Sequence, residues 1–165
     1  MTAAKLQSAN GQFSFPGRVA FYVDANDGAN QNLGTSSSST YVKVEWENLI
    51  YEQGGSNFNL TNNEYTIPSG CTGLWQFNLN LSWQIPDASI MFLEASIINT
   101  NGTPTSIAGL THATNNTGGI DYSGVQVSGI MKCTAGDTIY INVRQGQPSS
   151  AKVFISSNWS GYFVG

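Results

Sequence analysis

The side chains that could carry out chemistry are few in this sequence. It has one histidine, His112, in a segment rich in Thr and Asn. A hydrolytic triad needs a base and an orienting carboxylate around a nucleophile, and no Gly-x-Ser-x-Gly element is present to hold a serine. Glu45 and Glu47 are a second candidate, as paired carboxylates, but their alternation with apolar residues fits a solvated strand face better. We therefore expect no enzyme activity and no catalytic residue.

One acidic segment offers oxygen ligands of the kind that calcium accepts. It runs from Asp24 through Asp27 to Asn30 and contains a glycine. Its spacing departs from the calcium-loop pattern, because Asp27 and Gly28 come one place early. Two interpretations stay open: a calcium site that uses Asp24 and Asp27, or a plain turn rich in Asx residues.

The composition predicts one domain with a polar but weakly charged surface. Only 10% of the 165 residues are charged: six are basic and ten are acidic. The basic residues are scattered, so the stripe that binds nucleic acid is missing. No apolar stretch approaches the roughly 20 residues that span a bilayer, and the first residues do not resemble a secretory signal peptide. A hydrophobic content of 40% argues against intrinsic disorder.

The periodicity along the chain indicates strands rather than helices. Residues 1–17 are small and polar and predict a tail or tether, which leaves 18–165 as the domain. Strands are expected at 19–23, 42–46, 74–83, 90–99, 106–110, 124–133, 138–144, 152–157 and 158–164, with loops at 24–40 and 111–119. The segment from Val42 to Gln53 also fits a helical stripe, but its β-branched residues favour a strand.

The clearest strand runs from Leu74 to Trp83. Successive strand side chains point to opposite faces, so one face receives the large apolar residues and the other the polar ones. The apolar set is Trp75, Phe77, Leu79, Leu81 and Trp83, and the polar set is Gln76, Asn78, Asn80 and Ser82. Short strands of this kind, separated by turns, predict an all-β protein, either a β-sandwich or a jelly roll.

Four segments stand out and occur in this order: Val44–Tyr51 followed by Asn57-Phe58, Glu64–Gly70 followed by Gly73–Phe77, Gly136–Val143, and Trp159–Val164. Together they resemble the globular head of complement C1q, in the tumour necrosis factor-like superfamily. Cys71-Thr72 is inserted relative to the family pattern, and no collagen repeat precedes the domain. The resemblance implies a jelly roll of about ten antiparallel strands. It also implies a homotrimer that serves as a recognition head, as such domains do on bacterial spores and on virus particles.

The same resemblance implies where the subunits meet. In the superfamily, the sheet with the 74–83 strand and the closing strand turns its outer face towards the partners. This places Gln76, Asn78, Asn80 and Tyr162 at the expected interface, where the amides need partners or water. The rings of Tyr22, Tyr122 and Tyr162 are open to two roles, packing against a subunit or stacking on a sugar.

Two further expectations follow from the resemblance. The strand that begins near Cys71 pairs with the one that ends near Cys133, so a disulfide is one prediction. Two free thiols are the alternative, which we favour because the chain resembles a protein made in the cytosol. Some heads of this family bind calcium, which keeps the site at Asp24 and Asp27 open.

We therefore expect a non-enzymatic, homotrimeric recognition or display head on a virus or phage particle. It would bind a host ligand, with a glycan as one candidate, and neither nucleic acid nor a membrane interior. The alternative is a secreted or cell-surface microbial adhesion or lectin domain.

Overall fold

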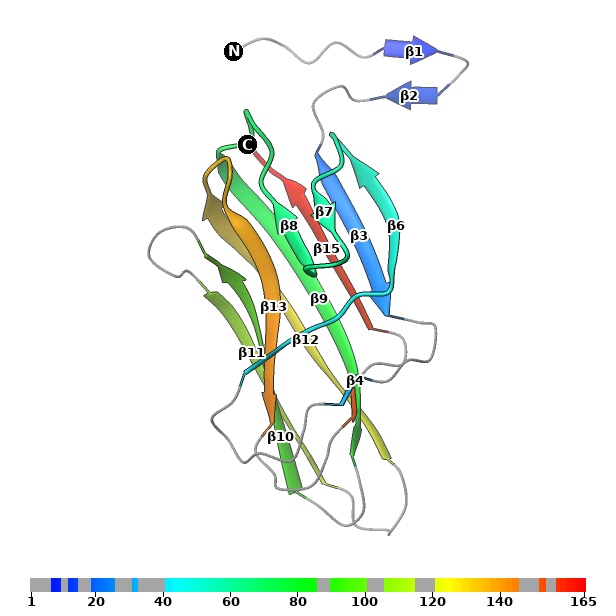
Figure 1. The fold of residues 1–165 in the computed structure, drawn as a ribbon, viewed down its shortest axis with the longest axis vertical. Helices are drawn as coiled ribbons and strands as arrows, with labels where there is room; N and C mark the ends of the chain where they lie inside the picture. The colour runs from blue at the N-terminus through cyan, green and yellow to red at the C-terminus, as the bar shows by residue number, and fades with distance from the viewer. Residues whose placement is uncertain are drawn as a thin grey trace.

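The computed structural model describes residues 7–9, 12–14, 19–25, 31–32, 41–85, 90–100, 106–114, 121–145, 152–153 and 157–165. Every regular element among these residues is a β-strand, and the strands form two large antiparallel sheets packed face to face (Figure 1). The predicted all-β sandwich is confirmed.

The first large sheet has seven strands, with the long strand β9 near its middle. Its order is β4 (Gln31–Asn32), β14 (Lys152–Val153), β9 (Gly73–Ile85), β15 (Ser157–Phe163), β3 (Ala20–Ala25) and β6 (Asn48–Gln53), and β12 (Asp121–Cys133) pairs with β9 over its whole length. The strands β9, β12 and β15 therefore form one continuous surface.

The second large sheet has six strands around β13. Its order is β11 (Ser106–Thr114), β10 (Ile90–Asn99), β13 (Thr138–Gln145), β8 (Glu64–Thr66) and β7 (Phe58–Asn59), and β5 (Val42–Lys43) also pairs with β13. A separate pair, β1 (Gln7–Ala9) with β2 (Gln12–Ser14), falls inside the predicted tail.

The core lies between the two large sheets and has the alternation that the sequence predicts. The five apolar side chains of β9 are each 3% exposed or less: Trp75, Phe77, Leu79, Leu81 and Trp83. Across the core, β13 contributes Ile139, Ile141 and Val143, all fully buried. Fully burying one such side chain contributes about 1.5–3 kcal/mol, so this layer dominates the stability of the sandwich.

Aromatic contacts join the two sheets. Phe21 of β3 stacks on Tyr65 of β8 with ring centroids 4.1 Å apart, and it meets Trp159 of β15 edge-on at 4.7 Å. Each such pair adds about 0.5–1.5 kcal/mol beyond its buried area. Trp159 also meets Phe58 of β7 at 5.8 Å, so the closing strand contacts the six-stranded sheet as well.

The predicted strand at 42–46 is too long, because its second half crosses between the sheets (Figure 1). The N–H of Val44 donates to Ile141 O of the six-stranded sheet at 2.9 Å, and the N–H of Glu47 donates to Asp24 O of the seven-stranded sheet at 3.0 Å. A segment that changes sheets cannot form one ladder. The burial alternation survives, since Val44 and Trp46 are buried and Glu45 is exposed.

Two predicted loops begin too early. Asp24 lies within β3, opposite Asn158 and Asn48, rather than in a loop. The backbone of His112 lies in β11, because that strand continues to Thr114 and pairs with the start of β10. The threonines in this stretch suit a strand as well as a loop, so composition alone misplaced the boundary.

Candidate subunit interface

The structure brings the four predicted interface residues onto one surface. The strand register places Gln76 of β9 between Ile130 of β12 and Tyr162 of β15. Asn78 and Asn80 follow along β9 on the same side, and all three amides are half-buried while Tyr162 is 48% exposed. We call the outward-pointing residues of β9, β12 and β15 the seven-stranded outer face.

Two of these amides, Gln76 and Asn78, belong to one hydrogen-bonded network. Gln76 Nε2 donates to Ser128 Oγ at 3.0 Å and to Asn78 Oδ1 at 3.3 Å. Ser128 Oγ in turn donates to Asn78 Oδ1 at 2.8 Å. For Gln76 and Asn78 the chain thus supplies partners that were expected from water or from another subunit. Covering this network costs less than covering unpaired amides would.

Beside the network lies an apolar patch of which the sequence predicted only Tyr162. It consists of Leu74, Ile130, Tyr162 and Val164, which are 44%, 59%, 48% and 54% exposed. Backbone bonds hold Leu74 against the end of the chain: its N–H donates to Gly165 O, and the N–H of Val164 donates to Leu74 O, both at 2.8 Å. The sequence could have indicated one further patch residue: Leu74 lies two positions before Gln76 on the same strand, so both side chains point to the same outward face.

Tyr22 lies on the same side of the sheet, farther from β9. It pairs across strands with Tyr51 of β6, which is 49% exposed. Tyr51 was also missed, because a register shift between Tyr22 and Val23 turns that stretch of β6 outward. The backbone of Tyr122 lies in β12, opposite Gln84, and its side chain falls outside the described residues.

The outward surface of the other sheet has a different chemistry. Arg144 of β13 donates from Nη2 to Glu94 Oε2 at 2.6 Å, and Tyr41 donates to Glu94 Oε1 at 2.9 Å. On the same side, Lys43 pairs with Glu64 and lies 4.4 Å from the centre of the Tyr140 ring. We call this surface, formed by outward residues of β5, β8, β10 and β13 with Tyr41, the six-stranded outer face.

The two residues of the predicted calcium site are not both described. Asp24 Oδ1 accepts a hydrogen bond from Asn48 Nδ2 at 3.0 Å, which ties β3 to β6. Asp27 lies outside the described residues, and within them no three His, Cys, Asp or Glu side chains gather as a metal site would need. Calcium binding stays a prediction.

The strands next to the two cysteines pair as the resemblance implied. Cys133 ends β12 directly opposite Gly73, and Gly73 lies two residues after Cys71 in the sequence. Both cysteines are buried, unbonded thiols in the structure. Burial raises the pKa of Cys71, and burial with the nearby Asp137 carboxylate raises that of Cys133 to about 12. Both thiols are therefore protonated and unreactive at neutral pH.

No helix among the described residues has the length and apolar character to cross a bilayer. The sequence matches no protein-family model, and it matches none of the curated proteins.

Solved structures resemble this chain over most of its length. The globular domain of the zebrafish complement 1qA protein superposes with a TM-score of 0.62 at 14% identity, over 89% of this chain and 98% of that one. Murine APRIL at pH 8.0 superposes with a TM-score of 0.60 at 12% identity, over 89% of this chain and 99% of that one. At these identities the likeness is one of fold. The chain therefore has the jelly-roll fold of the C1q and tumour necrosis factor-like domains.

Proposed function

We propose that this protein is a non-enzymatic recognition head that assembles as a homotrimer through the seven-stranded outer face. The observation that carries the proposal is the composition of that face. Four large exposed apolar side chains adjoin amides that already bond one another, and the described outward residues of β9, β12 and β15 include one charge, on Lys132.

The energetics of burial support an interface at this position. Interface centres are depleted in charge and enriched in aromatic residues, as here with Tyr162. Contiguous apolar patches on a monomer's surface mark interaction sites. Covering Leu74, Ile130 and Val164 removes apolar area from water, at about 25 cal/mol per Å².

Counting subunits tests the assembly. Native mass spectrometry of the full chain should show one dominant species of three copies. A spectrum of single chains at micromolar concentration would contradict the proposal. A dominant dimer would also contradict the proposal, because the proposed assembly has three copies.

We place the trimer on a virus or phage particle, where it binds a host ligand. The support is the sparsely charged surface rich in Asn, Ser and Thr, which suits a head packed beside copies of itself. Antibodies against the chain should label purified particles. Labelling of the producing microbe's surface or medium, with unlabelled particles, would replace this location with the adhesion or lectin alternative.

A further inference from the structure

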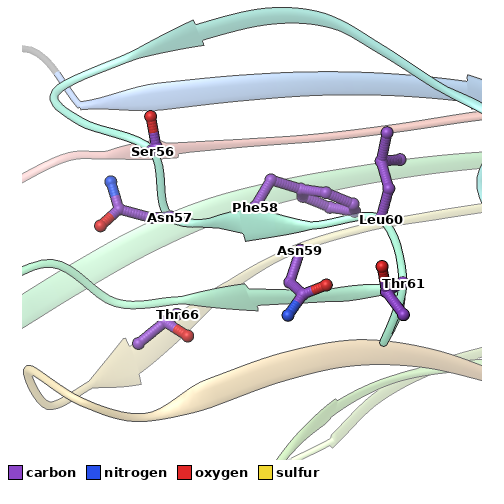
Figure 2. A pocket seen from close by; sticks show the side chains of 7 residues that line it. All are labelled: Ser56, Asn57, Phe58, Asn59, Leu60, Thr61 and Thr66. Carbon is purple, nitrogen blue, oxygen red and sulfur yellow. The ribbon is translucent and has the colours of Figure 1, made fainter.

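Two adjoining hollows lie around the turn at 60–63, which joins β7 to β8. The first, of about 550 Å³, is lined by Ser56, Asn57, Phe58, Asn59, Leu60, Thr61 and Thr66 (Figure 2). The second, of about 340 Å³, is lined by Gln31, Glu45, Trp46, Glu47, Leu60, Thr61 and Asn63. Both fall within the roughly 300–1,000 Å³ of small-molecule sites. Leu60 and Thr61 line both hollows, so one elongated ligand could contact the two together.

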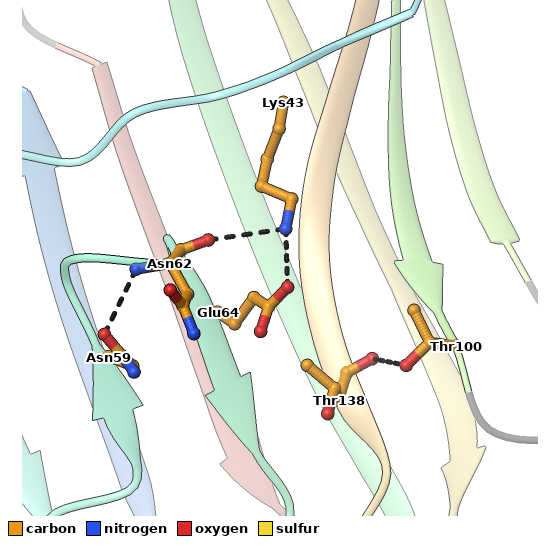
Figure 3. Close-up of polar contacts among 6 residues, drawn as sticks. All are labelled: Lys43, Asn59, Asn62, Glu64, Thr100 and Thr138. Atoms are coloured by element: carbon orange, nitrogen blue, oxygen red, sulfur yellow. Dashed lines mark hydrogen bonds and ion pairs between the residues drawn. The ribbon is translucent and has the colours of Figure 1, made fainter.

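The turn between the hollows is held from both sides. Asn59 Oδ1 accepts from the N–H of Asn62 at 3.1 Å, while Lys43 Nζ donates to Asn62 O at 3.3 Å and also pairs with Glu64 (Figure 3). Asn63 has a left-handed backbone (φ 57°), and its Oδ1 accepts from the N–H of Trp46 at 2.6 Å. A site built on fixed backbone loses little conformational entropy when a ligand binds.

The wall of the second hollow is braced by Gln31. Its Nε2 donates to Lys43 O at 2.7 Å, and its Oε1 accepts from the N–H of Glu45 at 3.1 Å. Three segments far apart in sequence, at 31, 43–47 and 59–63, are therefore joined around one surface. The bracing fixes the position of the Glu45 backbone and leaves its side chain exposed.

The polar groups that remain for a ligand include both donors and acceptors. In the described part of the chain, the hydroxyls of Ser56, Thr61 and Thr66 have no hydrogen-bond partner, and neither does the Glu45 carboxylate. A hydroxyl both donates and accepts, whereas a carboxylate only accepts. Leu60 adds an apolar surface, 37% exposed, at the point where the two hollows meet.

We propose that the two hollows form one binding site for a neutral oligosaccharide that lies across Leu60 and Thr61. Sugar hydroxyls match this mixture of donors and acceptors, and the C–H face of a ring suits Leu60. The site disfavours acidic sugars, because the exposed Glu45 carboxylate repels a carboxylate or sulfate while the neighbouring Lys43 is engaged by Glu64. This inference rests on the proposed recognition function and names its ligand class.

Thr61→Arg is the central variant, because a large side chain at this exposed position obstructs both hollows. Thr134→Arg is the matched control, since Thr134 is an exposed threonine beside another turn and lines neither hollow. Both variants should melt like the unmodified chain, since neither position is buried. The probe is a glycan array that displays neutral oligosaccharides beside their sialylated counterparts, followed by calorimetric titration with the neutral glycan retained most strongly.

We expect the array to retain neutral glycans. Their sialylated counterparts should bind at least about tenfold more weakly, because the sialic acid carboxylate and the Glu45 carboxylate repel each other in a partly desolvated site. Thr61→Arg should lower the affinity by at least about tenfold through steric obstruction, and Thr134→Arg should leave it unchanged. Retention of no neutral glycan, equal retention of the sialylated forms, or full binding by Thr61→Arg would each overturn the site. The subunit count on the same samples separates the two proposals: a trimer without glycan binding overturns only this site, and a glycan-binding monomer overturns only the assembly.

Discussion

The outer faces of the two sheets differ in how they satisfy their polar groups. On the six-stranded outer face, charged side chains pair with each other and stack on tyrosines, as Arg144 does with Glu94 and, at 5.2 Å, with the Tyr41 ring. On the seven-stranded outer face, neutral amides bond each other beside an exposed apolar patch. Ion pairs at partly exposed positions suit contact with water, whereas neutral networks beside apolar groups suit contact with protein.

The comparison shows that low charge is a local property of this molecule. Lys43, Glu64, Glu94 and Arg144 all lie on the six-stranded outer face. The 10% of charged residues is therefore spread unevenly. The described outward residues of β9, β12 and β15 carry one charge, on Lys132, and the exposed apolar patch lies on this weakly charged surface.

The largest expected effect comes from a charge placed in the apolar patch. Ile130→Arg should disrupt the trimer, because three guanidinium groups would lose water without gaining partners. Ile98→Arg is the matched control, since Ile98 lies opposite Tyr140 on the six-stranded outer face. Sedimentation velocity should show monomers for Ile130→Arg and trimers for Ile98→Arg. The same sedimentation behaviour for both variants would contradict the assignment of the interface to the seven-stranded outer face.

A smaller effect is expected from the amide network. Asn78→Ala leaves the Ser128 hydroxyl without its acceptor and removes one of the acceptors of Gln76. In a buried interface this should cost about 1–3 kcal/mol of unfolding free energy. Asn142→Ala, on the outward side of β13, should change stability by less than about 0.5 kcal/mol, as surface substitutions usually do. Denaturant unfolding measures both values. If Asn78→Ala lowers the free energy of unfolding no more than its control does, water reaches the network and no other subunit covers this face.

The ion pair on the six-stranded outer face should contribute less still. Glu94→Gln removes the carboxylate that Arg144 and Tyr41 share, and the side chains of Glu94 and Arg144 are 19% and 32% exposed. We expect a small loss of thermal stability that shrinks further at high salt, because water and salt screen such pairs. A large loss that is independent of salt would mean that this face, too, is covered in the assembly.

The smallest effect is a titration shift at Tyr41. Its hydrogen bond to Glu94, helped by slight burial and by the Glu94 charge, raises the pKa of the phenol above its ordinary value of 10.0. Because the folded-state pKa is raised, this contribution to stability is complete below pH 10 and is lost as the pH rises through the folded-state pKa. Ultraviolet difference titration against Tyr41→Phe should show the phenol ionising at lower pH in Glu94→Gln. An unchanged titration would show that the bond is absent in solution.

The sequence predicted the layers well because the alternation is strong where a strand is long. Residues 74–83 and 90–99 show this, and the inward and outward sets of β9 follow from period-two counting alone. The segment at 44–47 was misjudged for a physical reason: its burial alternates like a strand, while its backbone bonds go to two different sheets.

The apolar patch was harder to predict because Gly129 disguises the alternation of β12. Gly129 lies on the inward side, where a Cβ would come within 2.8 Å of the Ile107 side chain, so a larger residue there would require Ile107 to shift. The apolar Ile130 next to it then points outward. From the sequence alone, a glycine beside an isoleucine does not indicate which of the two faces the core.

The hollows around Leu60 could not be predicted from local sequence. Their walls combine β4, the crossing segment and the turn after β7, which only the folded chain brings together. Gln31 shows the difficulty, because its role depends on backbone atoms of Lys43 and Glu45, which are 12 and 14 residues away along the chain.

Footprinting of two matched tyrosines tests the central claim most directly. In the isolated chain Tyr162 of the seven-stranded outer face is 48% exposed and Tyr41 of the six-stranded outer face is 45% exposed, so hydroxyl radicals should modify both at similar rates. If the seven-stranded outer face is buried between subunits, Tyr162 is protected several-fold relative to Tyr41, and Ile130→Arg removes the protection. Equal modification of the two tyrosines in the unmodified protein would contradict the account.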